Sequence, residues 1–480
     1  MGSYEAVIGL ECHVELNTRT KMFCACTNAF GAEPNTQTCP VCLGHPGTLP
    51  VPNREAISRI ITIGLALGSE IAPRSLFHRK NYFYPDMPKN YQISQYDLPI
   101  CVGGHLDVEL PDGGTSRVGI TRVHMEEDTG KTTHGSESGR IHDATHASVD
   151  FDRAGVPLVE CVSEPDIRSP EEAAAYLREL RATLEALDVS DVRMEEGSLR
   201  CDANVSLRPT GTETLGTKVE IKNMNSIRSL ERALVYEIER QTAALDAGEP
   251  IVQETRHWNE DRGETVSMRS KEEAFDYRYF PEPDIPAMAP DPAWVEELRA
   301  AIPELPRARR DRYSAELGLK PDVARVLVAD RDAAALFDET VALGADAAGS
   351  ANWITQDVAA IRHADDEDLL TARHVADLVA AVQDGTLSSA GAKQVLEEAA
   401  RTGDPIGRIV DRSGLRQVSD AGELGAWADA VIAEHPDVAE KFRAGKEGVI
   451  GFLVGQLMQK AGGAANPKVA QDLLRERLQG

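Results

Sequence analysis

The chain has 480 residues, more than one hydrophobic core usually serves, so two or three domains are expected. Its formal net charge of −27 argues against indiscriminate binding to DNA, to other nucleic acid or to anionic lipid, although it leaves room for a local basic patch. The sequence has no apolar run long enough to span a bilayer, and its first residues lack the pattern of a signal peptide, which predicts a cytoplasmic protein with no membrane partner.

The first predicted element is a strand over residues 9–16, with the sequence GLECHVEL. Side chains alternate between the two faces of a strand, so Glu11, His13 and Glu15 share one face and apolar residues share the other. Two carboxylates and an imidazole on one face make this strand a candidate part of a site.

A cluster of cysteines follows the strand. Five of the eight cysteines lie between residues 12 and 42, which in a cytosolic protein favours metal binding over disulfides. Four of them have the spacing C-x-C-x12-C-x2-C across a loop rich in Gly, Pro and Asn, which predicts a closed structural zinc site. The alternative is a loop with spare thiols. The four predicted zinc ligands are Cys24, Cys26, Cys39 and Cys42.

From the start to about residue 290 the pattern is mostly short alternating strands and turns, interrupted by two predicted helices. One helix covers about residues 54–67, and the other opens at Ser169 with Pro170 at its first position. Strands with interspersed helices and no regular βαβ rhythm predict an α+β fold.

A proline-rich stretch over residues 279–294 cannot be helix or central strand, and it predicts a domain boundary. The chain beyond it is rich in Ala and Leu with helical periodicity, and a weaker boundary lies near 401–407. The predicted domains are therefore a mixed domain over 1–293, a helical domain over 294–405 and a helical tail over 406–480.

Two further predicted strands carry polar residues in alternation. Asp202 and Asn204 share a face in residues 201–208, and Lys218, Glu220 and Lys222 share a face in the next strand. Any one such strand is more often the solvated face of an antiparallel sheet than a site.

Glu160 differs because it lies inside an almost wholly apolar strand, where an ionised carboxylate is costly unless it is paired or binds a cation. Residues 124–131 add Glu126 and Glu127, but the apolar phase shifts between Ile120 and Val123, so periodicity leaves open which glutamate faces inward. Carboxylates and short polar ligands are suited to a hard cation such as Mg²⁺, completed by phosphate oxygens, which points to nucleotide chemistry.

Long segments of the chain resemble the GatB family, the B subunits of the tRNA-dependent amidotransferase GatCAB. They are GLECHVEL, KNYFYPDMPKNYQISQYDLPI, HMEEDTGK, DFDRAGVPLVE, MEEGSLRCDANVSLR, EIKNMNS and GFLVGQLMQKAGGAANP. The resemblance runs nearly end to end. It implies a glutamine-synthetase-like cradle domain followed by two all-α domains, of which the last contacts tRNA.

The resemblance also implies a reaction. With ATP and Mg²⁺, proteins of this family phosphorylate the side-chain carboxylate of Glu on tRNA(Gln) or of Asp on tRNA(Asn), and ammonia then displaces the phosphate to give the amide. The chain has no amidase signature, so its partner GatA, braced by GatC, is expected to supply the ammonia from glutamine. The residues leave either misacylated tRNA, or both, open as substrates.

Carried over residue by residue, the resemblance implies a metal and phosphate cluster, with Glu126 as a second choice for one position. The cluster consists of Glu11, His13, Glu127, Glu160, Asp202 and Glu220. Weaker candidates for phosphate contacts, each of which could equally be a surface charge, are Lys80, Arg200, Lys218 and Lys222.

Three positions depart from the family pattern. Asp152 stands where the family usually has Asn, and Cys12 and Cys161 stand where aliphatic residues are expected. Since both cysteines alternate away from the site residues beside them, we expect free thiols in the core.

The tail offers a local excess of basic residues for tRNA phosphates, although a mixed helical surface would look similar. They are Lys441, Arg443, Lys446, Lys460, Lys468, Arg475 and Arg477. Two other classes of protein stay open on the residues alone: a stand-alone metal hydrolase, and a tRNA-binding adaptor whose metals are structural.

Overall fold

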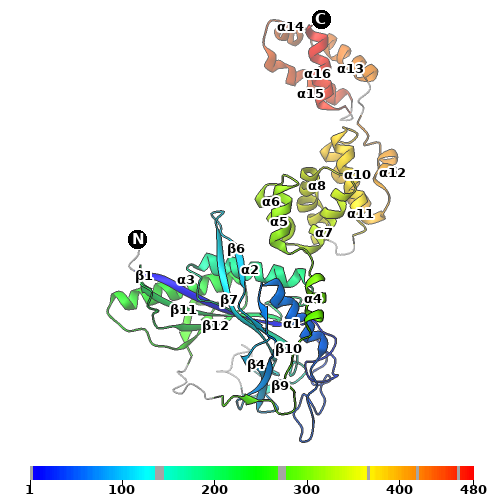
Figure 1. The fold of residues 1–480 in the computed structure, drawn as a ribbon. Helices are drawn as coiled ribbons and strands as arrows, with labels where there is room; N and C mark the ends of the chain where they lie inside the picture. Colours follow the sequence, from blue (N-terminus) through cyan, green and yellow to red (C-terminus); the bar gives the residue numbers. More distant parts are fainter. Residues whose placement is uncertain are drawn as a thin grey trace. The chain divides into compact units, whose positions relative to one another are not determined.

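The structure is a computed structural model that describes residues 4–135, 145–268, 277–364, 368–417, 421–461 and 465–479. The chain divides into two compact units, Met1–Pro306 and Arg307–Gly480, each of which is described by itself. Strands gather in the first unit and helices fill the second (Figure 1), so the expected mixture of α and β structure is confirmed.

The first unit is built on one sheet, which has 13 strands in the described part of the chain. Neighbouring strands pair antiparallel except for one parallel pair, β12 with β13. The order along the sheet is β14 (Glu264–Ser267), β13 (Thr255–Asn259), β12 (Val219–Met224), β11 (Leu199–Pro209), β1 (Tyr4–Glu15), β10 (Pro157–Ser163), β7 (Thr115–Glu127), β4 (Tyr91–Leu98), β3 (Leu76–Asn81) and β15 (Phe280–Pro281).

Shorter strands complete the β structure. Next to β7 lie β5 (Cys101–Val102), which also pairs with β2 (Glu70–Ile71), and β6 (His105–Glu109). A separate hairpin consists of β8 (Lys131–His134) and β9 (Ala147–Asp150).

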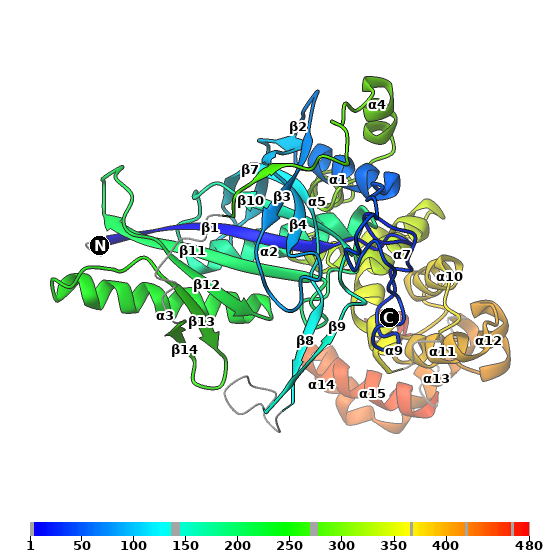
Figure 2. The same cartoon turned by 90° about the horizontal axis from the view of Figure 1, so that it is seen from below.

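Strand β1 is central, with β10 on one side and β11 on the other (Figure 2). Its side chains alternate between buried and partly exposed, as the sequence predicted for residues 9–16. The buried side chains include Cys12, which with Cys161 belongs to the main core, so both unexpected cysteines are free buried thiols as expected.

Helices close the apolar side of this unit. The two predicted helices are present as α1 (Arg54–Ala66) and α2 (Pro170–Ala186), and the Ser169 hydroxyl accepts a hydrogen bond from the amide of Glu172 at the start of α2. The prediction of only two helices is wrong, because α3 (Ile227–Asp246) packs on α2 and on β11. The buried side of α3 includes a glutamate and a glutamine, so the sequence lacks the regular spacing of apolar residues that marks a helix.

The first unit extends past the predicted boundary at residue 293. Helix α4 (Pro292–Ala300) packs on α1, where its Trp294 and Leu298 lie against the main core and the Arg54 guanidinium lies 5.2 Å from the Trp294 ring. The apolar side of α4 therefore packs within the mixed unit.

The second unit is helical in its described residues, and no described helix is long and apolar enough to cross a bilayer. Its helices are α5 (Pro306–Ala315), α6 (Pro321–Val328), α7 (Arg331–Ala342), α8 (Ala347–Trp353), the π-helical turn η2 (Ile354–Val358), α9 (Ala359–Ala364), α10 (Ala372–Gln383), α11 (Ser389–Thr402), α12 (Ile406–Ser413), α13 (Ala421–Glu434), α14 (Pro436–Arg443), the 3₁₀ turn η3 (Glu447–Val449), α15 (Ile450–Lys460) and α16 (Pro467–Gln479).

These helices form two hydrophobic cores. One gathers buried side chains between Tyr313 and Val410, and the other gathers buried side chains between Leu424 and Leu478. Helix α12 belongs to the first core through Ile406 and Ile409, because it packs on α10 and α11. The division between the cores thus follows α12, whereas the sequence placed it before that helix.

Candidate active site

One face of the sheet collects the polar residues of its central strands. Glu160 on β10 lies opposite His13 on β1 and opposite His124 on β7. Asp202 on β11 lies opposite Glu11 on β1. Residues paired in this way share a face, so the predicted site residues of three strands meet on one surface.

The centre of this face is a cluster of His13, Glu126 and Glu160, each of which offers a ligand atom within 4.8 Å of the others. The Nε2 atom of His13 lies 3.6 Å from the Glu160 Oε2 atom. Two carboxylates and an imidazole this close are a donor set that can hold a divalent cation. The neighbouring groups decide how much negative charge the cluster keeps.

His124 partly offsets that charge. Its Nε2 atom lies 3.4 Å from Glu126 and 3.3 Å from Glu160. Burial opposes a charge on His124, but the two carboxylates outweigh it and raise its pKa to about 9. The same contacts hold the pKa of each carboxyl below its usual range despite the cost of burial.

Glu126 is fixed in place by β4. The Ser94 hydroxyl donates to one carboxylate oxygen at 2.8 Å, and the Gln92 amide donates to the other at 3.1 Å. All three side chains are buried. A carboxylate with both oxygens held in this way keeps a fixed orientation toward His13 and Glu160.

Glu11, Asp202 and Glu220 form a second acidic group beside the cluster. Burial and the charges of Glu160 and Glu220 raise the pKa of the Glu11 carboxyl. Asn204 donates to Glu11 at 3.0 Å, and the Lys222 ammonium lies 2.5 Å from Asp202 and 2.9 Å from Glu220. Three carboxyl groups around one ammonium leave this part of the face with more acidic groups than Lys222 balances.

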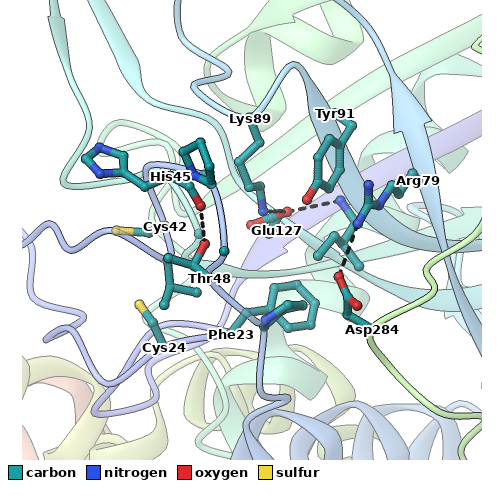
Figure 3. Close-up of a pocket in the computed structure, with 17 residues that line it drawn as sticks. Phe23, Cys24, Cys42, His45, Thr48, Arg79, Lys89, Tyr91, Glu127 and Asp284 are labelled. Atoms are coloured by element: carbon teal, nitrogen blue, oxygen red, sulfur yellow. Dashed lines mark hydrogen bonds and ion pairs between the residues drawn. The ribbon is translucent and has the colours of Figure 1, made fainter.

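Glu127 does not join either group, so the structure departs here from the preference for Glu127 over Glu126. Glu127 points to the opposite face of β7, where it pairs with Lys89 and accepts a hydrogen bond from the backbone amide of Ile93 at 3.0 Å (Figure 3). A cavity of about 240 Å³ separates this pair from the cysteine loop. The glutamate that faces His13 is Glu126.

The four cationic candidates lie in different surroundings. Lys80 contributes to lowering the pKa of the Glu126 carboxyl, and its ammonium lies 5.1 Å from the Tyr277 ring. Arg200 donates to the buried Asp128 at 2.6 Å, while Lys218 lines a cavity beside Glu11. Lys222 bridges two carboxylates. Of the four, only Lys218 has neither an ion pair nor a ring contact within the described part of the chain.

The cavity beside Glu11 has a volume of about 490 Å³. Its walls combine backbone at Gly9 and Gly216 with polar side chains such as Asn204 and Ser206. Pockets that bind small molecules commonly join a few placed polar groups to apolar walls. A small molecule bound in this cavity would therefore lie next to Glu11, one of the second acidic group.

The predicted zinc ligands also meet. The sulfur atoms of Cys24, Cys26, Cys39 and Cys42 all lie within 4.8 Å of one another, and Figure 3 shows two of them at the edge of the Glu127 cavity. Four thiols at this separation fit a closed tetrahedral metal site.

Asp152 holds this loop to the rest of the unit. Its two carboxylate oxygens accept hydrogen bonds from the backbone amides of Thr36 at 3.2 Å and Gln37 at 2.7 Å. Asn35, whose φ of +62° places it in the left-handed region, accepts from the Phe151 amide at 2.8 Å. The departure from the family pattern at position 152 thus supplies two bonds to the loop.

Several residues of the face were missed from the sequence. His124 and Ser94 contact the cluster, and Tyr96 stacks on Tyr279 with ring centroids 5.3 Å apart, beside His124. His124 lies two positions before Glu126 and therefore shares its face, which is a signal that the sequence carried. The partners from β4 depend on long-range pairing and left no local signal.

Comparison with known proteins identifies the class and then the family. Residues 6–296 match the family model of the GatB/GatE catalytic domain, and residues 335–478 match that of the GatB domain. The chain is 51% identical to the B subunit of the aspartyl/glutamyl-tRNA(Asn/Gln) amidotransferase of Rippkaea orientalis, covering 99% of this chain and 98% of that protein. It is 52% identical to the B subunit of the same name from Moorella thermoacetica, covering 99% and 100%.

These matches span both units, and the first of them is to a catalytic domain. The chain belongs to the GatB/GatE family. The family recognised from its motifs is confirmed.

Proposed function

We propose that this chain is the amide-forming component of an aspartyl/glutamyl-tRNA(Asn/Gln) amidotransferase. It is a ligase that converts Glu on tRNA(Gln), or Asp on tRNA(Asn), to the amide. The observation that carries the chemistry is the cluster of His13, Glu126 and Glu160, whose ligand atoms lie within 4.8 Å of one another at the centre of a polar sheet face. The names of its near relatives support the substrate.

The residues present fit magnesium. His13, Glu126 and Glu160 would bind one ion. Glu11, Asp202 and Glu220 would add negative charge beside it. The bound ion would neutralise part of the charge on the phosphate oxygens. The excess negative charge around Glu11 supports a cation at this position. Oxygen ligands and a phosphate partner are what Mg²⁺ prefers.

ATP is the phosphoryl donor in this proposal. Its γ-phosphoryl group passes to the side-chain carboxylate of the aminoacyl group, ADP leaves, and ammonia then displaces phosphate. The cavity of about 490 Å³ beside Glu11 has the volume for a nucleoside. Lys218 on its wall, and Lys222 beside Asp202, would contact phosphate oxygens. Arg200 holds the buried Asp128, and the charge of Lys80 favours the ionised form of Glu126.

The partners follow from the same proposal. As one component of a larger enzyme, the chain assembles with other subunits. We propose that GatA supplies the ammonia and that GatC stabilises GatA. The polar face then forms the floor of a glutamine-synthetase-like cradle, and the enzyme works in the cytoplasm. The tail would contact tRNA, although Lys441, Lys460 and Arg477 already pair with acids of their own unit.

Zinc has a structural part in the proposal. Four thiolates close the coordination of Zn²⁺, so no position is left for an activated water. The loop would instead stiffen the segment that leads into β10, to which it is tied through Asp152.

The test is transfer of labelled γ-phosphate from ATP to Glu-tRNA(Gln), with formation of Gln-tRNA, by this chain with purified GatA and GatC. Glu160→Gln removes a carboxylate from the cluster, and Glu164→Gln, four residues further along and bonded to Thr121, is the matched control. We expect Mg²⁺-dependent amide formation that is lost in Glu160→Gln and kept in Glu164→Gln.

Two outcomes would replace the proposal. tRNA binding without phosphoryl transfer would make the chain an adaptor. ATP turnover that does not depend on misacylated tRNA would make it a hydrolase. If Glu160→Gln kept full activity, the proposed reaction would still hold. The cluster of His13, Glu126 and Glu160 would then have no part in it.

A further inference from the structure

Lys21 is a lysine with no exposed surface, a state that lysine side chains seldom adopt without a charged partner. Its ammonium donates to the Phe151 carbonyl at 3.2 Å and lies 3.9 Å from the Cys42 sulfur. A buried ammonium with one neutral acceptor is costly, so the charge that it faces must be accounted for.

No carboxylate supplies that charge. In the described part of the chain, Lys21 has no ion pair with an aspartate or glutamate. Glu127 also lies beside Gly155, but it pairs with Lys89. The remaining candidate beside the ammonium is the sulfur of Cys42, together with the three sulfurs that meet it.

Thiols would not serve as that partner, because four neutral sulfurs leave Lys21 a lone buried cation. A divalent ion bound by four thiolates is different, since the centre keeps a net charge of minus two. Lys21 then faces an anion at close range in a site from which water is excluded. The contact gains most when the metal is present, because the metal holds all four sulfurs as thiolates.

We propose that Lys21 is the internal counter-ion of a four-thiolate metal centre formed by Cys24, Cys26, Cys39 and Cys42. The inference rests on the zinc part of the proposed function and is independent of the amide-forming chemistry. The Lys21 ammonium lies within hydrogen-bonding distance of the Cys42 sulfur, and it acts by stabilising the charge of the bound centre.

A second donor supports this assignment. The backbone amide of Cys39 donates to the Cys42 sulfur at 3.1 Å. Cys42 therefore receives both an amide hydrogen and a nearby ammonium, while it is also the most buried of the four ligands. Donors that converge on one sulfur are what a thiolate, rather than a thiol, requires.

The local backbone is arranged around the lysine. Gly155 has a φ of +87°, and a Cβ added there would lie 3.5 Å from Cys42 Cβ and 3.6 Å from Lys21 Cδ. The Gly155 carbonyl accepts a hydrogen bond from the amide of Met22 at 2.7 Å. The stem of Lys21 is thus held between the cysteine loop and the chain that leads into β10.

The first test measures zinc affinity of the purified full chain by competition with a chromophoric chelator. Lys21→Met should lower the affinity for Zn²⁺ by about tenfold or more, the usual effect of removing a partner of a metal ligand. Lys21→Arg keeps the charge and should lose less. Lys89→Met removes another buried lysine near the cysteine loop, one that has no hydrogen bond to a sulfur in the described residues, so it should change zinc affinity by less than about twofold.

The second test separates the counter-ion from a packing role by thermal unfolding with and without zinc. Stripping the metal should lower the unfolding temperature more in the wild type than in Lys21→Met, because only the wild type is left with a buried ammonium that has lost the four-thiolate anion. If Lys21→Met is insoluble, Lys21→Gln, which can still donate to Phe151, takes its place and must show the same change.

Equal zinc affinity of the wild type and Lys21→Met would overturn the proposal, as would an equal effect of stripping on both. A wild type that binds no zinc would overturn it too. None of these results touches the amide-forming activity, which is measured separately, so a failure here is distinct from a failure of the proposed function.

Discussion

Glu126 and Glu127 are neighbours in β7 but lie on opposite faces of the sheet. Glu126 accepts from Ser94 and Gln92 and lies with the histidine and glutamate of the central cluster. Glu127 pairs with Lys89 in the cavity beside the cysteine loop. Two adjacent residues of the same type thus serve separate parts of the molecule.

Substitution of the two glutamates should separate those parts. Glu126→Gln is expected to abolish Mg²⁺-dependent amide formation. Glu127→Gln breaks a buried ion pair and should lower the free energy of unfolding by about 3 kcal/mol. Urea unfolding and the phosphoryl-transfer assay measure the two effects, and a stable but inactive Glu127→Gln would reverse the assignment.

Lys222 is expected to oppose the binding of a divalent cation on this face, because it neutralises Asp202 and Glu220 beside the cluster. Removing it as Lys222→Met leaves the acids near Glu11 uncompensated, so affinity for Mn²⁺ in the absence of nucleotide should rise by about fivefold, since one charge at ~4 Å is worth about 1 kcal/mol even in water. Amide formation should fall, because a phosphate contact is lost.

Calorimetric titration with Mn²⁺ measures that change. Lys218→Met is the control, because Lys218 lines the neighbouring cavity without an ion pair in the described residues. An unchanged or weaker affinity in Lys222→Met would mean that the charges of Asp202 and Glu220 do not support cation binding on this face.

Asp152 should contribute measurably to the stability of the cysteine loop. Asp152→Asn keeps one acceptor oxygen and should cost about 1 kcal/mol, whereas Asp152→Ala loses both bonds and should cost about 2 kcal/mol. The rate of zinc release to a chelator should rise in the same order. Glu33→Gln, on the same loop and without a side-chain hydrogen bond in the described residues, should match the wild type.

Two truncations should behave differently. A chain that ends at residue 417 keeps α12, so the first core of the second unit should keep its stability. Its binding to tRNA should be weaker. A chain that ends at residue 405 also loses Ile406, Ile409 and Val410, each at most 2% exposed, and should lose roughly 5 kcal/mol of stability. Thermal unfolding and filter binding of tRNA measure both, and equal stability of the two chains would contradict the role of α12.

The side-chain period of β1 made the face with Glu11 and His13 predictable, because a strand with one buried face has a strict alternation. The ambiguity at Glu126 has a local cause. The register of β7 against β10 shifts where Ser163 pairs with Ile120 and Val162 pairs with Arg122, so Thr121 is an extra residue on β7. A bulge there moves the apolar phase and puts Glu126 on the polar face.

Other features left no local signal. The buried Glu237 and Gln241 concealed the apolar stripe of α3, since helical periodicity is read from apolar residues. The burial of Lys21 depends on sulfurs that come from elsewhere in the loop. Helix α12 joins the first core of the second unit because its isoleucines contact helices of that core. The Gly and Pro residues before α12 mark a turn, but they do not indicate which core the helix joins.

The position of β1 also affects the order in which the chain can fold. It is the first strand to be synthesised, yet its partners lie at residues 157–163 and 199–209. At ribosomal rates of roughly 5–20 residues per second, β1 waits about 10 to 40 s for them. During that time both of its edges offer unpaired amide and carbonyl groups. We therefore expect nascent chains of this protein to bind holding chaperones until β11 has emerged from the ribosome.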